Sequence, residues 1–135
     1  MATSLQFIKS ASASNVASFD ITDVFSSRYD SYVVTTKNFQ NTDGNNAWIS
    51  LRLINSGGTT LTTSTYDIAQ LQMSSNANFG ENRYVGQNRF QYSISYSESG
   101  GNGNAGNLYI HNPYDSTSYT SVKRDSGYWY SGGSR

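Results

Sequence analysis

Hydrophobic and polar residues alternate most regularly in residues 89–97, RFQYSISYS. Every second position there carries an apolar side chain: Phe90, Tyr92, Ile94 and Tyr96. Because successive side chains of a β-strand point to opposite faces, this period of two predicts a strand with one apolar face and one hydroxyl-rich face. Full burial would let each apolar side chain contribute roughly 1.5–3 kcal/mol to folding.

Shorter stretches rich in β-branched and aromatic residues predict further strands along the whole chain. They are residues 5–10, 16–21, 31–39, 46–54, 66–73, 107–112, 119–124 and 127–131. One short helical turn is expected at residues 22–30, with Thr22 or Asp23 as its N-cap. No longer segment shows the 3.6-residue period of a helix.

Turn-forming residues separate these strands. Asp43-Gly44 and Gly57-Gly58 are suited to tight hairpins, and a glycine- and asparagine-rich loop follows residue 97. Pro113 is expected to end the strand before it, because proline has no amide proton for a ladder. Eight or nine short strands thus predict a single all-β domain over residues 1–135, an antiparallel two-sheet sandwich or jelly roll.

The composition points to a neutral polar surface. Only 13% of residues are charged and the net charge is zero, whereas the chain holds 23 serines, 14 asparagines and 12 threonines. Without a basic surplus to neutralise phosphates, we expect no nucleic-acid partner. Faces of this kind pack against one another or meet sugars without burying unpaired ions.

The chain has no cysteine, and no apolar run long enough to span a membrane. Its first residues, MATSLQFIKS, lack the continuous apolar region of a secretory signal. We therefore expect no association with a membrane. We also expect the protein to be synthesised in the cytoplasm of the producing cell.

Catalytic chemistry finds little support in the sequence. His111 is the single histidine, and no G-x-S-x-G nucleophile elbow occurs. With no cysteine and one histidine, a zinc site is not expected. The nine carboxylates form no obvious acid and base pair, so we expect a non-enzymatic protein with no catalytic residue, metal or cofactor.

Aromatic residues are the candidate binding groups. Tyr128, Trp129 and Tyr130 stand together near the C-terminus, and Trp48 alternates with polar residues. Exposed aromatic rings stack on sugars or anchor a protein partner. The same side chains could instead belong to the core, with the tyrosines flanking Trp129.

Three motifs together resemble a family of small phage virion structural proteins that is frequent in marine and cyanobacterial phages. They are LRLINSGG at Leu51–Gly58, YDIA at Tyr66–Ala69 and IHNPY at Ile110–Tyr114. The resemblance spans nearly the whole chain and implies a tail-fibre, appendage or capsid-surface (decoration) component of a virion. It also implies copies of itself as partners, with trimers common in fibres, together with other virion proteins.

Members of that family continue with further strands beyond the SGYWYSGG region, whereas this chain ends at Arg135. We therefore expect either a short member or a sandwich completed at its C-terminal end by another subunit or by a missing segment, with an edge strand available for pairing. Two alternatives stay open. One is a carbohydrate-binding β-sandwich module for a host-surface glycan in adsorption, and the other is a polysaccharide hydrolase.

Overall fold

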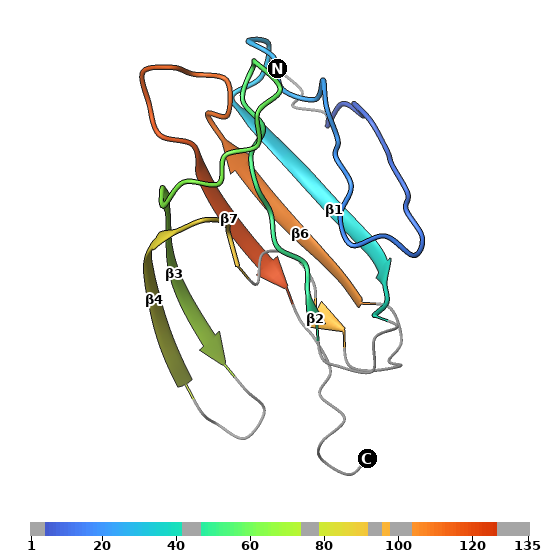
Figure 1. Cartoon of the computed structure of the whole chain (residues 1–135), viewed down its shortest axis with the longest axis vertical. Coiled ribbons are helices and arrows are strands. Elements are labelled where there is room, and N and C mark those ends of the chain that lie inside the picture. Colours follow the sequence, from blue (N-terminus) through green and yellow to red (C-terminus); the bar gives the residue numbers. More distant parts are fainter. Residues whose placement is uncertain (1–4, 42–46, 74–78, 92–95, 98–103, 127–135) are drawn as a thin grey trace.

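The computed structural model describes residues 5–41, 47–73, 79–91, 96–97 and 104–126 (Figure 1). Its strands are β1 (Ser31–Phe39), β2 (Ala47–Trp48), β3 (Tyr66–Met73), β4 (Phe79–Gln87), β5 (Tyr96–Ser97), β6 (Asn104–His111) and β7 (Ser121–Ser126). The predicted all-β antiparallel fold is confirmed, and the described residues form no helix. They contain seven strands, where eight or nine were predicted for the whole chain.

The strands form one larger sheet and two pairs. The larger sheet has the order β1-β6-β7, so the central strand β6 joins a partner from early in the chain to one from late in the chain. β2 pairs with β5, and β3 pairs with β4 as a hairpin. Figure 1 shows this hairpin to one side of the larger sheet, beyond β7.

The inner face of the larger sheet carries the core. Tyr32 and Val34 of β1 lie opposite Ile110 and Leu108 of β6, and Val122 of β7 continues the same face. Leu108 is 0% exposed. This is the period-two pattern expected for a sheet with one buried face.

Residues from the loops around the sheet cover this core. Phe25 and Tyr29 precede β1, and Ile49 and Leu51 follow β2; all four pack against the buried cluster. The rings of Phe25 and Tyr32 meet edge to face at 4.9 Å between centroids, a favourable aromatic geometry. In Figure 1 the green segment after β2 runs across the face of β6 and β7.

Two buried tyrosines fix backbone segments with their hydroxyls. The Tyr32 hydroxyl accepts from the amide of Ser26 at 2.9 Å and donates to the carbonyl of the same residue at 3.0 Å. The Tyr66 hydroxyl accepts from the Leu53 amide at 3.1 Å and donates to the Leu61 carbonyl at 3.0 Å. Each hydroxyl therefore satisfies two part-buried backbone groups at once.

The predicted turn at Gly57-Gly58 is confirmed. Asn55 closes it, because its side-chain oxygen accepts from the amides of Gly57 at 3.0 Å and Thr59 at 2.9 Å. Gly58 has a φ of 79°, a left-handed conformation that glycine adopts without steric cost. Beyond the turn, Thr60 forms a bridge to Ile54.

The other strand predictions divide into correct and displaced ones. The expected strands at 31–39 and 66–73 have the bounds of β1 and β3. Those expected at 107–112 and 119–124 correspond to β6 and β7 with ends shifted by one to three residues. β6 ends just before Asn112 and Pro113, as the proline predicts.

Three predicted elements near the N-terminus are wrong. Residues 5–10 and 16–21 form no strand, because no neighbouring strand of the described chain pairs with them. Residues 22–30 form bends and a turn without a helix. Asp23 has a φ of 59°, and the hydroxyl of Thr22 is bonded to the Asp23 carboxylate, so neither residue caps a helix.

The strand predicted at 46–54 is shorter than expected, because β2 covers Ala47–Trp48 alone. Of the strand predicted at 89–97, residues 92–95 lie outside the described residues, and β5 covers Tyr96–Ser97. Trp48 pairs with Tyr96 and Leu51 with Phe90, so two residues on one side and five on the other separate the two contacts. This unequal spacing interrupts the ladder between the two pairs. β4 was not predicted, because its sequence FGENRYVGQ is rich in glycine, asparagine and charge. The turn predicted at Asp43-Gly44 and the strand at 127–131 lie outside the described residues.

Candidate interaction surfaces

The outer face of the larger sheet is a neutral polar surface. The hydroxyl of Ser31 lies 2.8 Å from Nδ1 of His111, and that of Thr35 donates to the Asn107 amide oxygen at 3.0 Å. These bonds join β1 to β6 across the sheet. Such cross-strand side-chain bonds stabilise a sheet modestly and leave a hydroxyl- and amide-rich surface to solvent.

Basic and acidic groups add little charge to this face. Lys123 on β7 lies 3.4 Å from Asp125, with both side chains more than half exposed, and its ammonium also sits 5.7 Å from the ring centroid of Tyr109. An exposed ion pair of this kind contributes about 0–1 kcal/mol. The face therefore presents hydrogen-bonding groups, the half-buried ring of Tyr109 and few charges.

The pairing of Ser31 with His111 is the contact in the described chain that comes nearest to a nucleophile and its base. A working pair also needs a group that orients the histidine and donors for an oxyanion. No carboxylate among the described residues bonds the His111 ring, and these residues contain no group of three histidine, cysteine or acidic side chains that could hold a metal ion.

Trp48 is the one predicted site residue that the described ranges include. It is half-buried on β2, and the guanidinium carbon of Arg124 from β7 lies 5.7 Å from its ring centroid. This cation–π contact joins the small β2–β5 pair to the larger sheet. Tyr128, Trp129 and Tyr130 lie outside the described residues, so the predicted aromatic cluster remains a prediction.

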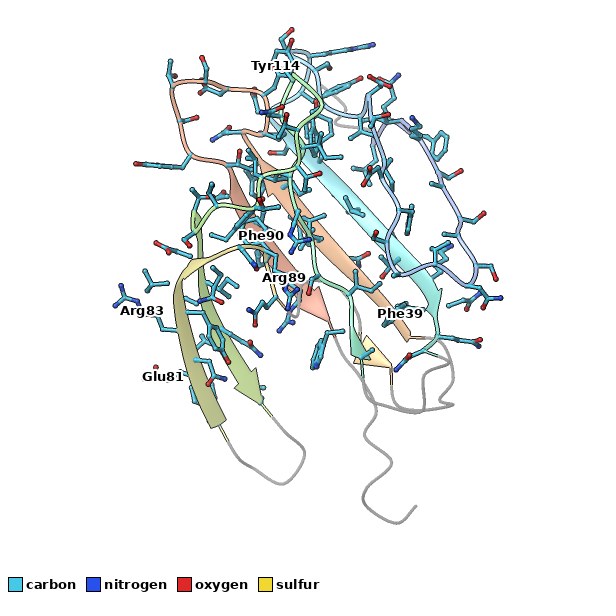
Figure 2. The ribbon with its side chains drawn as sticks, in the orientation of Figure 1. Phe39, Glu81, Arg83, Arg89, Phe90 and Tyr114 are labelled. Atoms are coloured by element: carbon cyan, nitrogen blue, oxygen red, sulfur yellow. The ribbon has the colours of Figure 1, made fainter. Side chains whose placement is uncertain are left out.

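Phe90, the first apolar residue of the regular alternation, is half-buried. Its ring meets the ring of Tyr66 edge to face at 4.7 Å between centroids. In Figure 2 Phe90 lies between the β3–β4 hairpin and the larger sheet. It therefore anchors the base of the hairpin, while Tyr92 and Ile94 lie outside the described residues.

The far end of the β3–β4 hairpin carries an exposed apolar surface that the sequence patterns did not identify. Met73 lies opposite Phe79, and Leu71 lies two residues before Met73 on the same face. These three residues, the hairpin patch, are 82%, 64% and 71% exposed in that order. Glu81 and Arg83 continue this face along β4 (Figure 2).

A second exposed apolar surface lies in residues 5–21, the N-terminal arm. It carries six apolar side chains that are each more than a third exposed: Leu5, Phe7, Ile8, Val16, Phe19 and Ile21. The sequence signal was the pair of strand-like stretches at 5–10 and 16–21. Their composition predicts strands, but the sequence does not show that no strand of the described chain pairs with them.

A short loop between β6 and β7 contains the clearest perturbed carboxylate. Asp115 accepts hydrogen bonds from the hydroxyl of Ser118 at 2.6 Å and from the amide and hydroxyl of Thr117 at 2.8 and 2.7 Å. These bonds favour the ionised form and lower the pKa of Asp115 to about 2, the bond from Ser118 contributing most. Through these hydrogen bonds, Asp115 shapes an exposed turn.

No protein-family model, curated protein or solved structure matches this chain. Among the residues described above, no helix is long and apolar enough to cross a membrane.

Proposed function

We propose that this chain is a non-enzymatic structural component of a phage virion, in a tail fibre or appendage or on the capsid surface, and that it acts through contacts between subunits. The observation that carries the proposal is the large excess of exposed apolar side chains. Among the residues that the structure describes, thirteen large apolar residues are exposed, whereas four form the buried core. Extended apolar patches on a soluble protein mark interaction surfaces.

The proposal includes a two-layer architecture. The sheet β1-β6-β7 is one layer, and the second consists of residues 47–61 with their bridges to Phe90 and to β5. Ile49 and Leu51 already pack from the second layer onto the buried cluster. Completion of the sandwich or jelly roll by another subunit follows naturally from the short second layer.

The three motifs that resemble phage virion proteins occupy positions that determine the fold. Asn55 of the first motif closes the turn before β3, and Tyr66 of the second fixes Leu53 and Leu61. Ile110 of the third motif lies on β6 and is buried on the inner face of the larger sheet. The motifs are thus structural, which agrees with a shared architecture and with a protein that has no motif for a reaction.

Light scattering after size-exclusion chromatography tests this proposal. We expect an oligomer whose mass is at least twice the 14.9 kDa of one chain. Trimers are the oligomeric state that fibres favour. Immunogold microscopy of particles from cells that produce the chain should then place label on virions. A monomer at all concentrations, together with unlabelled particles, would refute the proposal.

A carbohydrate-binding module is the second candidate, and the outer face of the larger sheet favours it. Hydroxyl, amide and aromatic groups lie there side by side, at Ser31, Asn107 and Tyr109. Sugars are bound by such combinations of planar polar groups and rings. A glycan array with Tyr109→Ala and Trp48→Ala as comparisons tests it, and the absence of any bound glycan would remove it. No contact described above carries the hydrolase alternative, and we do not propose it.

A further inference from the structure

We propose that the hairpin patch of one copy binds the N-terminal arm of a second copy, so that each chain offers one surface to each of two neighbours. This inference rests on the proposed function, because it names the surfaces through which the chain would assemble. It commits to a second copy of this chain as the occupant of both surfaces.

Within the described part of the chain, the hairpin has no third strand or covering layer on its apolar face. Met73, Phe79 and Leu71 stay exposed there, and the described hydrogen bonds of the hairpin to other parts of the chain lie at its base, around Tyr66. A two-stranded hairpin is marginal by itself in water, and a third strand or a packed layer is what gives such a unit stability.

The N-terminal arm lacks a neighbouring strand, and the hairpin could provide one. Its sequence is strand-like at both ends, yet no strand of the described chain pairs with it. Two of its side chains form its described bonds to the rest of the chain. Lys9 donates to the carbonyl of Thr22, and the side-chain oxygen of Gln6 accepts from the hydroxyl of Tyr29. An extended apolar segment with free backbone groups is the kind of partner that an open strand edge accepts.

The two surfaces cannot meet within one chain in this fold. In Figure 1 the blue arm lies beside β1, whereas the β3–β4 hairpin lies on the opposite side of the picture, beyond β7. A contact between them therefore joins different copies. It is heterologous, and repeated it gives a closed ring or an open filament.

The charges near the two surfaces are balanced. Glu81 and Arg83 flank the hairpin patch, and Lys9 and Asp20 belong to the arm, so each surface offers one group of each sign. The net charge of the chain is zero, and copies therefore do not repel one another.

Disulfide cross-linking tests the inference directly, because the chain contains no cysteine. Ser10→Cys marks the arm, and Glu81→Cys marks the face of the hairpin patch. Asn82→Cys is the matched control, since Asn82 is the next residue of β4 and points to the other face. The Ser10→Cys protein is isotopically labelled and mixed with each hairpin variant, and the mixtures are oxidised and analysed by mass spectrometry.

We expect disulfides between labelled and unlabelled chains for Glu81→Cys, at several times the yield found for Asn82→Cys. Dimers formed only by Glu81→Cys with itself would show a hairpin-to-hairpin contact and overturn the inference. Equal yields for Glu81→Cys and Asn82→Cys would also overturn it.

Phe79→Asp gives an independent test in the full chain, with Asn82→Asp as its control. Phe79 is mostly exposed, so the variant is expected to fold, which circular dichroism checks. We expect the dissociation constant of the assembly to rise by roughly tenfold or more for Phe79→Asp and to change little for Asn82→Asp. An assembly that keeps its mass and affinity in Phe79→Asp overturns this inference alone, whereas a wild-type monomer overturns the proposed function as well.

Discussion

The larger sheet and the β3–β4 hairpin are built from strands of similar length, yet they differ in what lies on their faces. β1 and β6 place Tyr32, Leu108 and Ile110 under a covering layer. β3 and β4 leave Leu71, Met73 and Phe79 in solvent. Both regions consist of strands paired with a neighbour, so the comparison separates strand formation, which needs a paired neighbour, from stability, which needs burial.

Replacing a leucine with alanine should give the largest difference in unfolding free energy between the two regions. Leu108→Ala should lower the free energy of unfolding by about 2–5 kcal/mol, because it opens a cavity in a fully buried position. Leu71→Ala should change it by less than about 0.5 kcal/mol at a concentration where the chain is monomeric. Urea unfolding of both variants checks this, and similar losses for the two would contradict the difference in burial.

Removing the tyrosine hydroxyls should sharpen the comparison. Tyr32→Phe and Tyr66→Phe each leave a part-buried amide and carbonyl without their partner, at a cost of about 1–3 kcal/mol. Tyr32→Phe should lower the stability of the whole sheet. Tyr66→Phe should accelerate amide hydrogen exchange in β3 and β4 first. Uniform acceleration in both variants would show that hairpin and sheet unfold as one unit.

Glycine substitutions isolate the contribution of backbone conformation to stability. A Cβ added to Gly58 or Gly80 meets no atom within 4 Å, but only Gly58 has a positive φ, of 79°. Gly58→Ala should therefore destabilise the chain by about 1–2 kcal/mol. Gly80→Ala, in β4, should be neutral or stabilising by about 0.4–1 kcal/mol. Thermal unfolding compares them, and a shift of the same sign and size in both would contradict the assigned turn.

The smallest effect is expected at Asp115. Its pKa is lowered from 3.8 to about 2, so its hydrogen bonds stabilise the fold fully above pH 3.8, and this contribution is lost as the pH falls through about 2. Ser118→Ala should raise the Asp115 pKa toward 3.8, because it removes the largest stabilising bond. Carbon-detected NMR titration of the carboxyl measures this, and an ordinary pKa in the wild type would refute the turn geometry.

The fold class could be predicted from sequence because the chain carries strong local signals. β1 and β3 have the predicted bounds, since β-branched and aromatic residues there coincide with real pairing partners. The turn around Asn55 was visible from Gly57-Gly58. Where a local pattern and a tertiary partner agree, sequence predicts structure well.

The remaining elements depend on partners that local sequence does not show. The arm has a strand-like sequence and no neighbouring strand, and β4 has a poor strand sequence and a good neighbour in β3. Pairing decided both outcomes against local propensity. Of the predicted site residues, Trp48 lies in the described structure and contacts Arg124. The hairpin patch went unpredicted because Phe79, which completes it, belongs to β4.

Concentration-dependent hydrogen exchange tests most directly whether other copies cover the exposed apolar surfaces. The amides of residues 5–21, 66–73 and 79–87 should become protected together as the protein concentration rises. The amides of β6, which is paired with a strand on each side, should keep the same exchange rates. If the arm and the hairpin exchange equally fast in dilute and concentrated solution, these surfaces do not join copies of the chain.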